Sequence, residues 1–265
     1  LTGLAHAALR PLVGATASYG LLLILTIGLN GIAGATLARR LGADVVPAFL
    51  VGVLVQALPF VVGQLGVLQL VAAWPMLLVL AFVIDLLERP RLGVGLRLGL
   101  ALAAVVGTCG YYALLLGLCL LPPTVAVWWR RPADRRRPVG AAATAAVVAV
   151  LLVGPVAIGQ EERLAGRRWS AATIEAGSAS WADWLPGGTR WPGWPLVALG
   201  VAGGLAARRR PTTPLLVGVG TIALLASLGS RVSIIGVRPW TLLVDHVDAV
   251  ARLRSPFRAA VLVEL

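Results

Sequence analysis

The chain has 265 residues, of which 58% are hydrophobic and only 13% are charged. Its mean hydropathy of +0.89 lies far outside the range of soluble domains. A net charge of +12 would suggest a nucleic-acid partner for a soluble protein, but basic clusters between apolar segments are typical of a membrane protein. We therefore predict an all-α, polytopic integral membrane protein whose partners are membrane lipids and not nucleic acid.

Apolar segments follow one another through the sequence. In chain order they are Leu12 to Leu37, Val45 to Val62, Val67 to Leu87, a helical hairpin within Leu92 to Trp129 that turns near Gly107 to Tyr112, Val139 to Ile158, Trp194 to Ala207, Pro214 to Leu228, and a last segment that starts near Phe257. A spanning helix needs about 20 mainly apolar residues. We predict about eight to nine transmembrane helices in a single domain, residues 1–265, with longer extracytoplasmic loops at about 160–191 and 230–255.

Arginine clusters separate successive pairs of these segments. The clusters are Arg39 and Arg40, Arg89 and Arg91, Arg130 with Arg131 and Arg135 to Arg137, and Arg208 to Arg210. Two segments between clusters return the chain to the same side of a bilayer each time. Because cytoplasmic loops carry the excess of basic residues, this side is predicted to be the cytoplasm.

The basic residues are all arginine, and Ala, Gly, Leu and Val are abundant. This composition is typical of a high-GC bacterial genome, so we expect a multi-pass protein of the bacterial plasma membrane. The chain opens at Leu1 without Met or a signal peptide, and it ends in an apolar run of about ten residues, half the length of a span. We expect an internal fragment of a longer protein.

A few polar residues lie within the predicted spans. Asn30 and Gln56 are predicted to form hydrogen bonds between helices. Asp85 is predicted to lie at the cytoplasmic interface, close to Glu88 and Arg89. Two further polar residues, Gln64 and Gln69, flank the outer end of the third span and are predicted to face an extracytoplasmic cavity.

The first outer loop combines arginine with tryptophan. It contains Arg163, Arg167, Arg168, Trp169, Trp181, Trp184 and Trp191. Guanidinium groups bind phosphate in two-point contacts, and flat indole rings suit a sugar or a lipid headgroup. We predict phosphate binding by Arg167 and Arg168, and stacking on Trp181 and Trp184. An aromatic belt with solvated charges is the alternative.

The second outer loop carries Arg252, Arg254 and Arg258 on the side where positive charge is disfavoured. A lipid-linked phosphate held by Arg254 and Arg258 explains these charges. Pairing with nearby acids explains them equally well, and the candidates are Asp245, Asp248, Glu161 and Glu162. We expect the two outer loops to meet in space, because their arginines are most simply explained by one shared anion.

Metal and cofactor chemistry have little support in the sequence. Asp245, His246 and Asp248 superficially offer ligands, but a lone histidine beside two acids is a weak pattern for a metal site. Cys109 and Cys119 both lie in apolar segments and are expected to be buried. No cofactor is identified, and a divalent metal is unsupported.

Four features in order resemble the bacterial membrane proteins of the GT-C glycosyltransferase superfamily. They are Ala38-Arg39-Arg40-Leu41; Pro59 to Gln69 leading into Trp74-Pro75; Gly110-Tyr111-Tyr112; and the late group of Ser178 to Pro186, Trp191-Pro192-Gly193-Trp194, Arg208 to Arg210 and Arg254-Ser255-Pro256-Phe257-Arg258. The resemblance covers most of the chain. It implies an enzyme that moves a sugar from a polyprenyl-phosphate donor to an acceptor at the outer face. It also implies a catalytic acid in the first extracytoplasmic loop, which is expected upstream of Leu1, so no catalytic residue is named.

Two other functions remain open. A lipid or polysaccharide transporter or flippase requires a polar path through the bilayer, for which the sequence offers little more than Asn30 and Gln56. A non-catalytic structural membrane protein would use the outer arginines for stability or for binding a partner. Whether the chain is an enzyme is therefore left undecided by the sequence.

Overall fold

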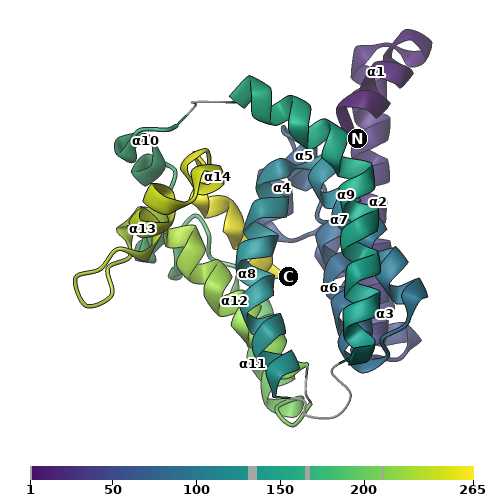
Figure 1. The fold of residues 1–265 in the computed structure, drawn as a ribbon, viewed down its shortest axis with the longest axis vertical. Helices are drawn as coiled ribbons and strands as arrows, with labels where there is room; N and C mark the ends of the chain where they lie inside the picture. The colour runs from purple at the N-terminus through teal and green to yellow at the C-terminus, as the bar shows by residue number, and fades with distance from the viewer. Residues whose placement is uncertain (1, 131–135, 165–167, 211) are drawn as a thin grey trace. The chain divides into compact units, whose positions relative to one another are not determined.

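Figure 1 shows the fold in a computed structural model of the chain. The structure describes residues 2–130, 136–164, 168–210 and 212–265, and the backbone alone for residues 136, 137 and 160–164. Every named element in this part of the chain is a helix, and one isolated bridge joins Ile234 to Val237. The predicted all-α class is confirmed.

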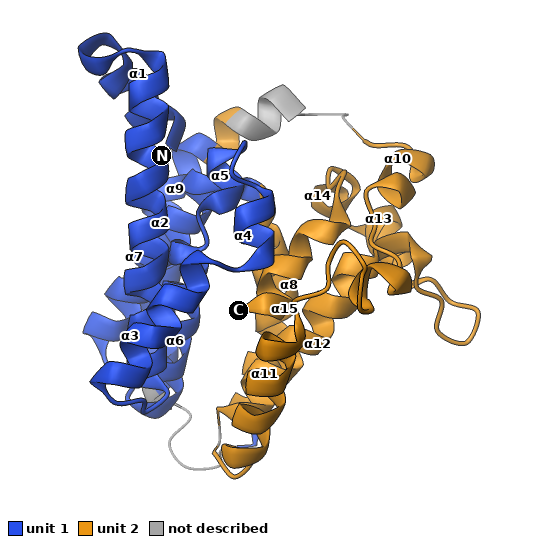
Figure 2. Ribbon diagram, turned by 180° about the vertical axis from the view of Figure 1, so that it is seen from behind, with its two compact units in different colours: residues 1–110, 130–156 blue, residues 111–129, 157–265 orange. Residues whose placement is uncertain are grey.

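The chain divides into two compact units, which Figure 2 colours separately. Unit 1 comprises residues 1–110 and 130–156. Its helices are α1 (Thr2–Val13), α2 (Ala15–Arg40), α3 (Val45–Gln56), α4 (Pro59–Gly63), α5 (Leu68–Val71), α6 (Trp74–Glu88), α7 (Leu92–Thr108) and most of α9 (Arg136–Leu164).

Unit 2 comprises residues 111–129 and 157–265. Its helices are α8 (Gly110–Trp129), α10 (Ala171–Ala176), α11 (Trp194–Ala206), α12 (Thr213–Leu228), α13 (Pro239–His246), α14 (Asp248–Ala251) and α15 (Ala260–Glu264), with short 3₁₀ turns η1 (Trp181–Trp184), η2 (Gly229–Arg231) and η3 (Pro256–Ala259).

Six stretches of the described chain are long and apolar enough to cross a membrane. They are Ala15–Arg40, Val45–Gly63, Leu68–Glu88, Gly110–Trp129, Pro138–Gly159 and Thr213–Arg231. The helices α7 and α11 are apolar but shorter. Several apolar helices of this kind indicate a membrane protein.

The helix boundaries differ from the predicted ones at prolines and glycines. The second predicted segment is broken before Pro59, and the third is broken between Val71 and Trp74, ahead of Pro75. Proline disfavours helical backbone in the residue before it, which accounts for the first break directly. The first segment starts at Ala15, because Gly14 adopts a φ of 83° and separates it from α1, a helix that the sequence pattern did not predict.

The core of unit 1 is built around α6, which is apolar on all sides and almost wholly buried against α2 and α7. Asn30 of α2 closes the break between α5 and α6. Its side-chain amide donates to the Val71 carbonyl, and its carbonyl oxygen accepts from the Trp74 backbone N–H, both at 2.8 Å. At the end of α2, the Arg40 guanidinium lies 3.4 Å from the Asp85 carboxylate.

These contacts confirm that Asn30 bonds between helices. They also give Asp85 a partner, Arg40, that its sequence neighbours did not indicate. Gln56 differs from the prediction, because its amide donates to Gly52 of its own helix, while the side chain packs over Gly31 of α2.

In unit 2, α12 packs against η3 and α15, and a small apolar cluster links the end of α12 to η3. Ala179, Leu228 and Val232 are the buried members of this cluster, and Trp184 and Phe257 pack against it. The cluster joins η1 and the end of α12 to η3, the turn that carries Arg258.

Candidate functional site

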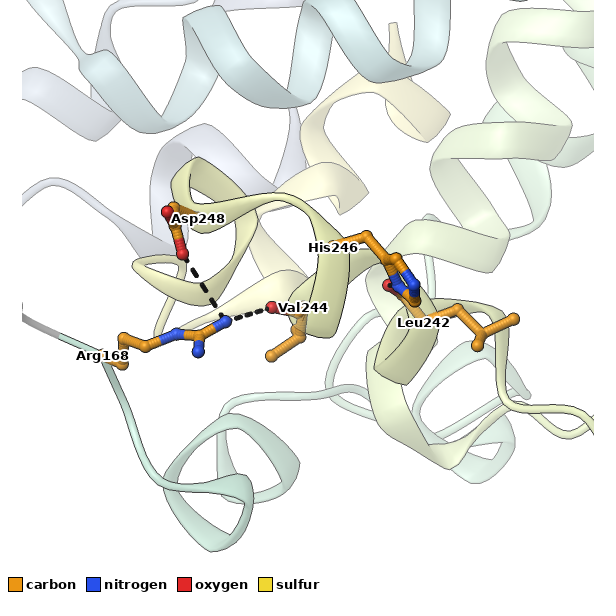
Figure 3. A network of polar contacts seen from close by, with 5 residues as sticks. All are labelled: Arg168, Leu242, Val244, His246 and Asp248. Atoms are coloured by element: carbon orange, nitrogen blue, oxygen red, sulfur yellow. Dashed lines mark hydrogen bonds and ion pairs between the residues drawn. The ribbon is translucent and has the colours of Figure 1, made fainter.

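The two segments of unit 2 that the sequence predicted to be outer loops meet, as expected. Arg168 donates to the Val244 carbonyl at 2.8 Å and lies 3.6 Å from the Asp248 carboxylate, contacts that Figure 3 shows from close by. Both of these side chains are largely exposed, so the ion pair adds little to stability. It joins the residues after α9 to the segment that contains α13 and α14.

Trp169 forms the second connection between these segments. Its backbone N–H donates to Ala251, and its indole N–H donates to the Arg252 carbonyl, each at 3.2 Å. The Arg254 guanidinium carbon then lies 5.4 Å from the centre of the Trp169 ring, within cation–π range. One tryptophan thus fixes the chain that leads into η3 and supports an exposed arginine beside it.

Two glycines allow η3 to sit close to its neighbours. A Cβ on Gly177 would collide with the carbonyl oxygen of Arg254, and Gly177 itself accepts a hydrogen bond from the Phe257 N–H. Gly229 has a φ of 51°, and a Cβ there would meet Pro256 at 2.9 Å. Only glycine suits these two positions, so the turn from Arg254 to Arg258 is held from two sides.

The guanidinium of Arg258 lies 4.4 Å from the centre of the Tyr111 ring. Its Nε and Nη1 atoms are buried and have no hydrogen-bond partner among the described residues. Within the same described part of the chain, no carboxylate forms an ion pair with Arg254 or Arg258. Both arginines rest on aromatic rings, which leaves them able to bind an anion.

A third arginine, Arg190, lies over the Phe257 ring at 4.2 Å. Burial lowers the pKa of its guanidinium, and the charges of Asp183 and Glu264 oppose that shift. An arginine remains cationic at neutral pH despite such a shift. Arg190 therefore joins the loop before α11 to η3 through the Phe257 ring, and its charge is opposed by Asp183 of the same loop and Glu264 of α15.

Asp183 organises the loop that carries Arg190. It accepts hydrogen bonds from the Ser180 backbone and hydroxyl at 2.7 Å and from the Thr189 hydroxyl at 2.7 Å. The Ser180 backbone bond is the largest cause that lowers the pKa of this carboxyl to about 2, and the Ser180 and Thr189 hydroxyls follow. A side chain so fully bonded is part of the fold and is not a free general base.

The predicted stacking tryptophans differ from each other. Trp181 exposes 58% of its surface, whereas Trp184 packs against the apolar cluster and donates its indole N–H to Ser227 at 3.2 Å. Trp181 alone keeps an open ring. Of the predicted phosphate ligands, Arg168 faces Asp248, and Arg167 lies outside the described residues.

Gln64 and Gln69 belong to unit 1. Gln64 ends α4 and is half-buried, and Gln69 is exposed on α5, which contacts α4. The structure thus places them at two short helices that contact each other, and their role at an extracytoplasmic cavity remains a prediction.

The suggested metal ligands have other partners. His246 bonds through Nδ1 to the Leu242 carbonyl at 2.8 Å, and Asp248 faces Arg168 (Figure 3). Within the described part of the chain, no three His, Cys, Asp or Glu side chains are grouped as metal ligands.

Sequence reasoning missed the supporting residues of this site. Trp169, Tyr111 and Arg190 each take part in a cation–π contact, but none was predicted as a site residue. The available signal was the spacing of aromatic residues among outer arginines. That signal does not reveal which ring faces which charge.

Comparison with known families gives one match. Residues 1–261 match the model of a domain of unknown function, DUF6311. The chain belongs to the DUF6311 family. No curated protein and no solved structure matches the chain. In this DUF6311 chain, the arginines around η3 are therefore the candidate functional site.

Proposed function

We propose that this DUF6311 chain is part of a membrane-embedded glycosyltransferase of the GT-C type, which uses a polyprenyl-phosphate-linked sugar at the extracytoplasmic face of a bacterial plasma membrane. The observation that supports it best is the pair Arg254 and Arg258, which have aromatic supports and no acidic partner among the described residues. Uncompensated arginine on an outer surface calls for an anionic ligand.

The topology that accompanies this proposal has eight to nine crossings. The six long apolar stretches supply six of them, and α7 and α11 supply two more. At 1.5 Å per residue, α11 is about 20 Å long, so its span requires local thinning of the bilayer or flanking interfacial residues. The turn η3 and α15 begin the ninth crossing.

The chemistry assigned to the arginines is stabilisation of the leaving group. When a glycosyl group departs from polyprenyl phosphate, negative charge develops on the phosphate. Fixed guanidinium groups at a water-poor interface stabilise that charge more strongly than mobile water does. Arg254 and Arg258 are proposed as the donor-phosphate ligands, with Arg168 and Arg167 second, and Trp181 offers a ring for the sugar.

The competing role as a transporter or flippase depends on polar side chains in the spans. Both polar ends of Asn30 are already bonded to backbone groups of Val71 and Trp74, and the amide of Gln56 is bonded to Gly52. These two residues therefore give no support to a polar path.

The test measures polyprenyl monophosphate binding to the purified protein in detergent or nanodiscs. Arg254→Ala and Arg258→Ala should each weaken binding about tenfold or more, as expected for the loss of a charge-assisted hydrogen bond. Arg208→Ala, which removes an exposed arginine from the predicted cytoplasmic side, is the matched control and should leave binding unchanged. Equal binding by all the variants would reject the proposal. Sugar transfer from the lipid-linked donor is then the assay for activity.

A further inference from the structure

The segment between η2 and α13 forms a tight turn with an apolar tip. Two backbone hydrogen bonds close it: Ile234 N–H donates to Val237 at 2.8 Å, and Val237 N–H donates to Ile234 at 3.0 Å. Ile235 and Gly236 occupy the two central positions, with φ values of 52° and 77°. In Figures 1 and 2 this turn is the open loop that projects beyond α13.

The tip is exposed to an unusual degree. Ile235 exposes 98% of its surface, and Ile234 and Val237 expose 48% and 49%. A β-branched residue with positive φ is a rare backbone outlier, and strained residues of this kind concentrate at functional surfaces. Asparagine or glycine would suit the position better in water, so isoleucine at this position favours an apolar environment around the tip.

Both ends of the turn are anchored on unit 2. Val232 belongs to the buried apolar cluster, and Trp240 at the start of α13 is 4% exposed. The exposed tip is therefore held on a fixed base, and it contacts its surroundings as a preformed element.

The charges beside the tip and its short distance from the end of a span indicate what surrounds it. Arg231 and Arg238 are exposed on either side of the tip, and Arg231 is also the last residue of the candidate span Thr213–Arg231. Ile235 follows Arg231 by four residues, so at full extension it lies at most about 14 Å from the end of that span. An apolar tip between two arginines, close to the end of a span, matches an interface of acyl chains beneath anionic headgroups.

We propose that the turn Ile234–Val237 inserts into the membrane interface, with Arg231 and Arg238 binding anionic lipid headgroups. This surface lies outside the site around η3, and the proposal does not depend on sugar transfer. It also gives a reason for two exposed arginines at the end of a span that is predicted to face outward.

The experiment places a fluorescent reporter on the tip. Ile235→Cys is labelled with NBD in the full chain and reconstituted into nanodiscs of phosphatidylglycerol and phosphatidylcholine, with spin-labelled lipid as the quencher. Glu175→Cys, on an exposed position of α10, is the control for another outer surface. Both native cysteines are buried, and the unsubstituted chain measures their background labelling.

We expect the label at residue 235 to be quenched by spin-labelled lipid about twofold or more above the label at residue 175, and to be protected from aqueous iodide. Arg231→Gln and Arg238→Gln are then added to the labelled chain. Each should reduce the preference of the tip for phosphatidylglycerol over phosphatidylcholine by about fivefold. Iodide quenching without lipid quenching would place the tip in water and overturn the proposal. Protection from both quenchers would place the tip against protein and overturn it as well.

Discussion

Arg258 has buried hydrogen-bond donors that no described neighbour accepts. Two of its buried guanidinium nitrogens, Nε and Nη1, have no acceptor among the described residues, although its ring contact with Tyr111 is favourable. A buried donor without an acceptor costs about 1–3 kcal/mol, and more when the group is charged. Arg190 differs, because it faces the charges of Asp183 and Glu264. This contrast is why we propose Arg258 as a ligand-binding residue and Arg190 as a residue that stabilises the fold.

Replacing Arg258 with methionine tests this distinction. Arg258→Met keeps an apolar chain of similar length beside Tyr111 and removes the unpaired donors. We expect the free energy of unfolding to stay level or to rise by about 1 kcal/mol, while binding of polyprenyl monophosphate falls. Arg190→Met should lower stability, because it removes the single positive charge that attracts Asp183 and Glu264. Thermal unfolding in detergent measures both variants, and a large loss of stability in Arg258→Met would show that Arg258 is structural.

Asp183 links the stability of its loop to pH. Its pKa falls from 3.8 to about 2 on folding, so the folded state binds this proton less readily than the unfolded state. The stabilisation is therefore complete above pH 4 and is lost as pH falls through about 2. Asp183→Asn should lower stability at neutral pH and flatten the acid limb of the stability curve.

Glu175→Gln on α10 is the control, and equal acid profiles for the two variants would contradict the prediction. Intrinsic fluorescence measures the profile, because Trp181 and Trp184 flank the loop.

At the level of elements, close helix contact in unit 1 depends on particular glycines. A Cβ on Gly52 of α3 would lie 2.6 Å from the Gly31 carbonyl of α2, and a Cβ on Gly99 of α7 would lie 2.7 Å from the Ala145 carbonyl of α9. Backbones approach this closely only where side chains are absent, which lets transmembrane helices gain packing energy without a hydrophobic driving force.

Gly28 and Gly52 form a matched pair for testing this packing. Gly52→Ala should destabilise the protein by about 1–3 kcal/mol, because the added methyl collides with backbone that has no rotamer to change. Gly28→Ala in α2 meets nothing within 4 Å, so the helix preference for alanine should make it neutral or stabilising by up to about 1 kcal/mol. Unfolding in a denaturing detergent titration measures both variants. Equal effects would mean that α2 and α3 are not packed as described.

The glycines of α2 show which features of these helices the sequence predicts and which it does not. Hydrophobic runs and arginine clusters located the apolar helices to within a few residues, because length and polarity are local properties. Gly28, Gly31 and Gly34 look alike in the sequence, yet Gly31 and Gly34 face α3 and Gly28 faces open space. Likewise, nothing local to Asp85 indicates Arg40, and nothing local to Trp169 indicates Arg254, because tertiary packing creates both contacts.

At the level of the whole molecule, the arginine clusters follow the positive-inside rule, whereas the arginines predicted to be outer go against it. The clusters near Arg40, Arg89 and Arg209 favour the cytoplasmic side, whereas Arg231, Arg254 and Arg258 follow spans that should end outside. We propose that phosphate or lipid headgroups neutralise the outer group. Both proposals place these arginines on the extracytoplasmic side of the membrane. A measurement of the side on which each loop lies therefore tests them together.

Labelling single cysteines with a membrane-impermeant maleimide on intact cells measures that sidedness. Glu175→Cys on α10 should be labelled from outside, because this position is exposed and follows a span that is predicted to lead outward. Gly93→Cys at the start of α7 and Arg209→Cys after α11 should be labelled only after the cells are opened, because both lie in predicted cytoplasmic segments. Cys109 and Cys119 are buried and should contribute little background. If Glu175→Cys and Gly93→Cys were labelled from the same side, the number of crossings between them would be even, and an extracytoplasmic donor site at η3 would no longer follow from the arginine pattern. If Glu175→Cys is labelled from outside and Gly93→Cys only after the cells are opened, the arginines around η3 face the outer leaflet, where a polyprenyl phosphate donor would reach them.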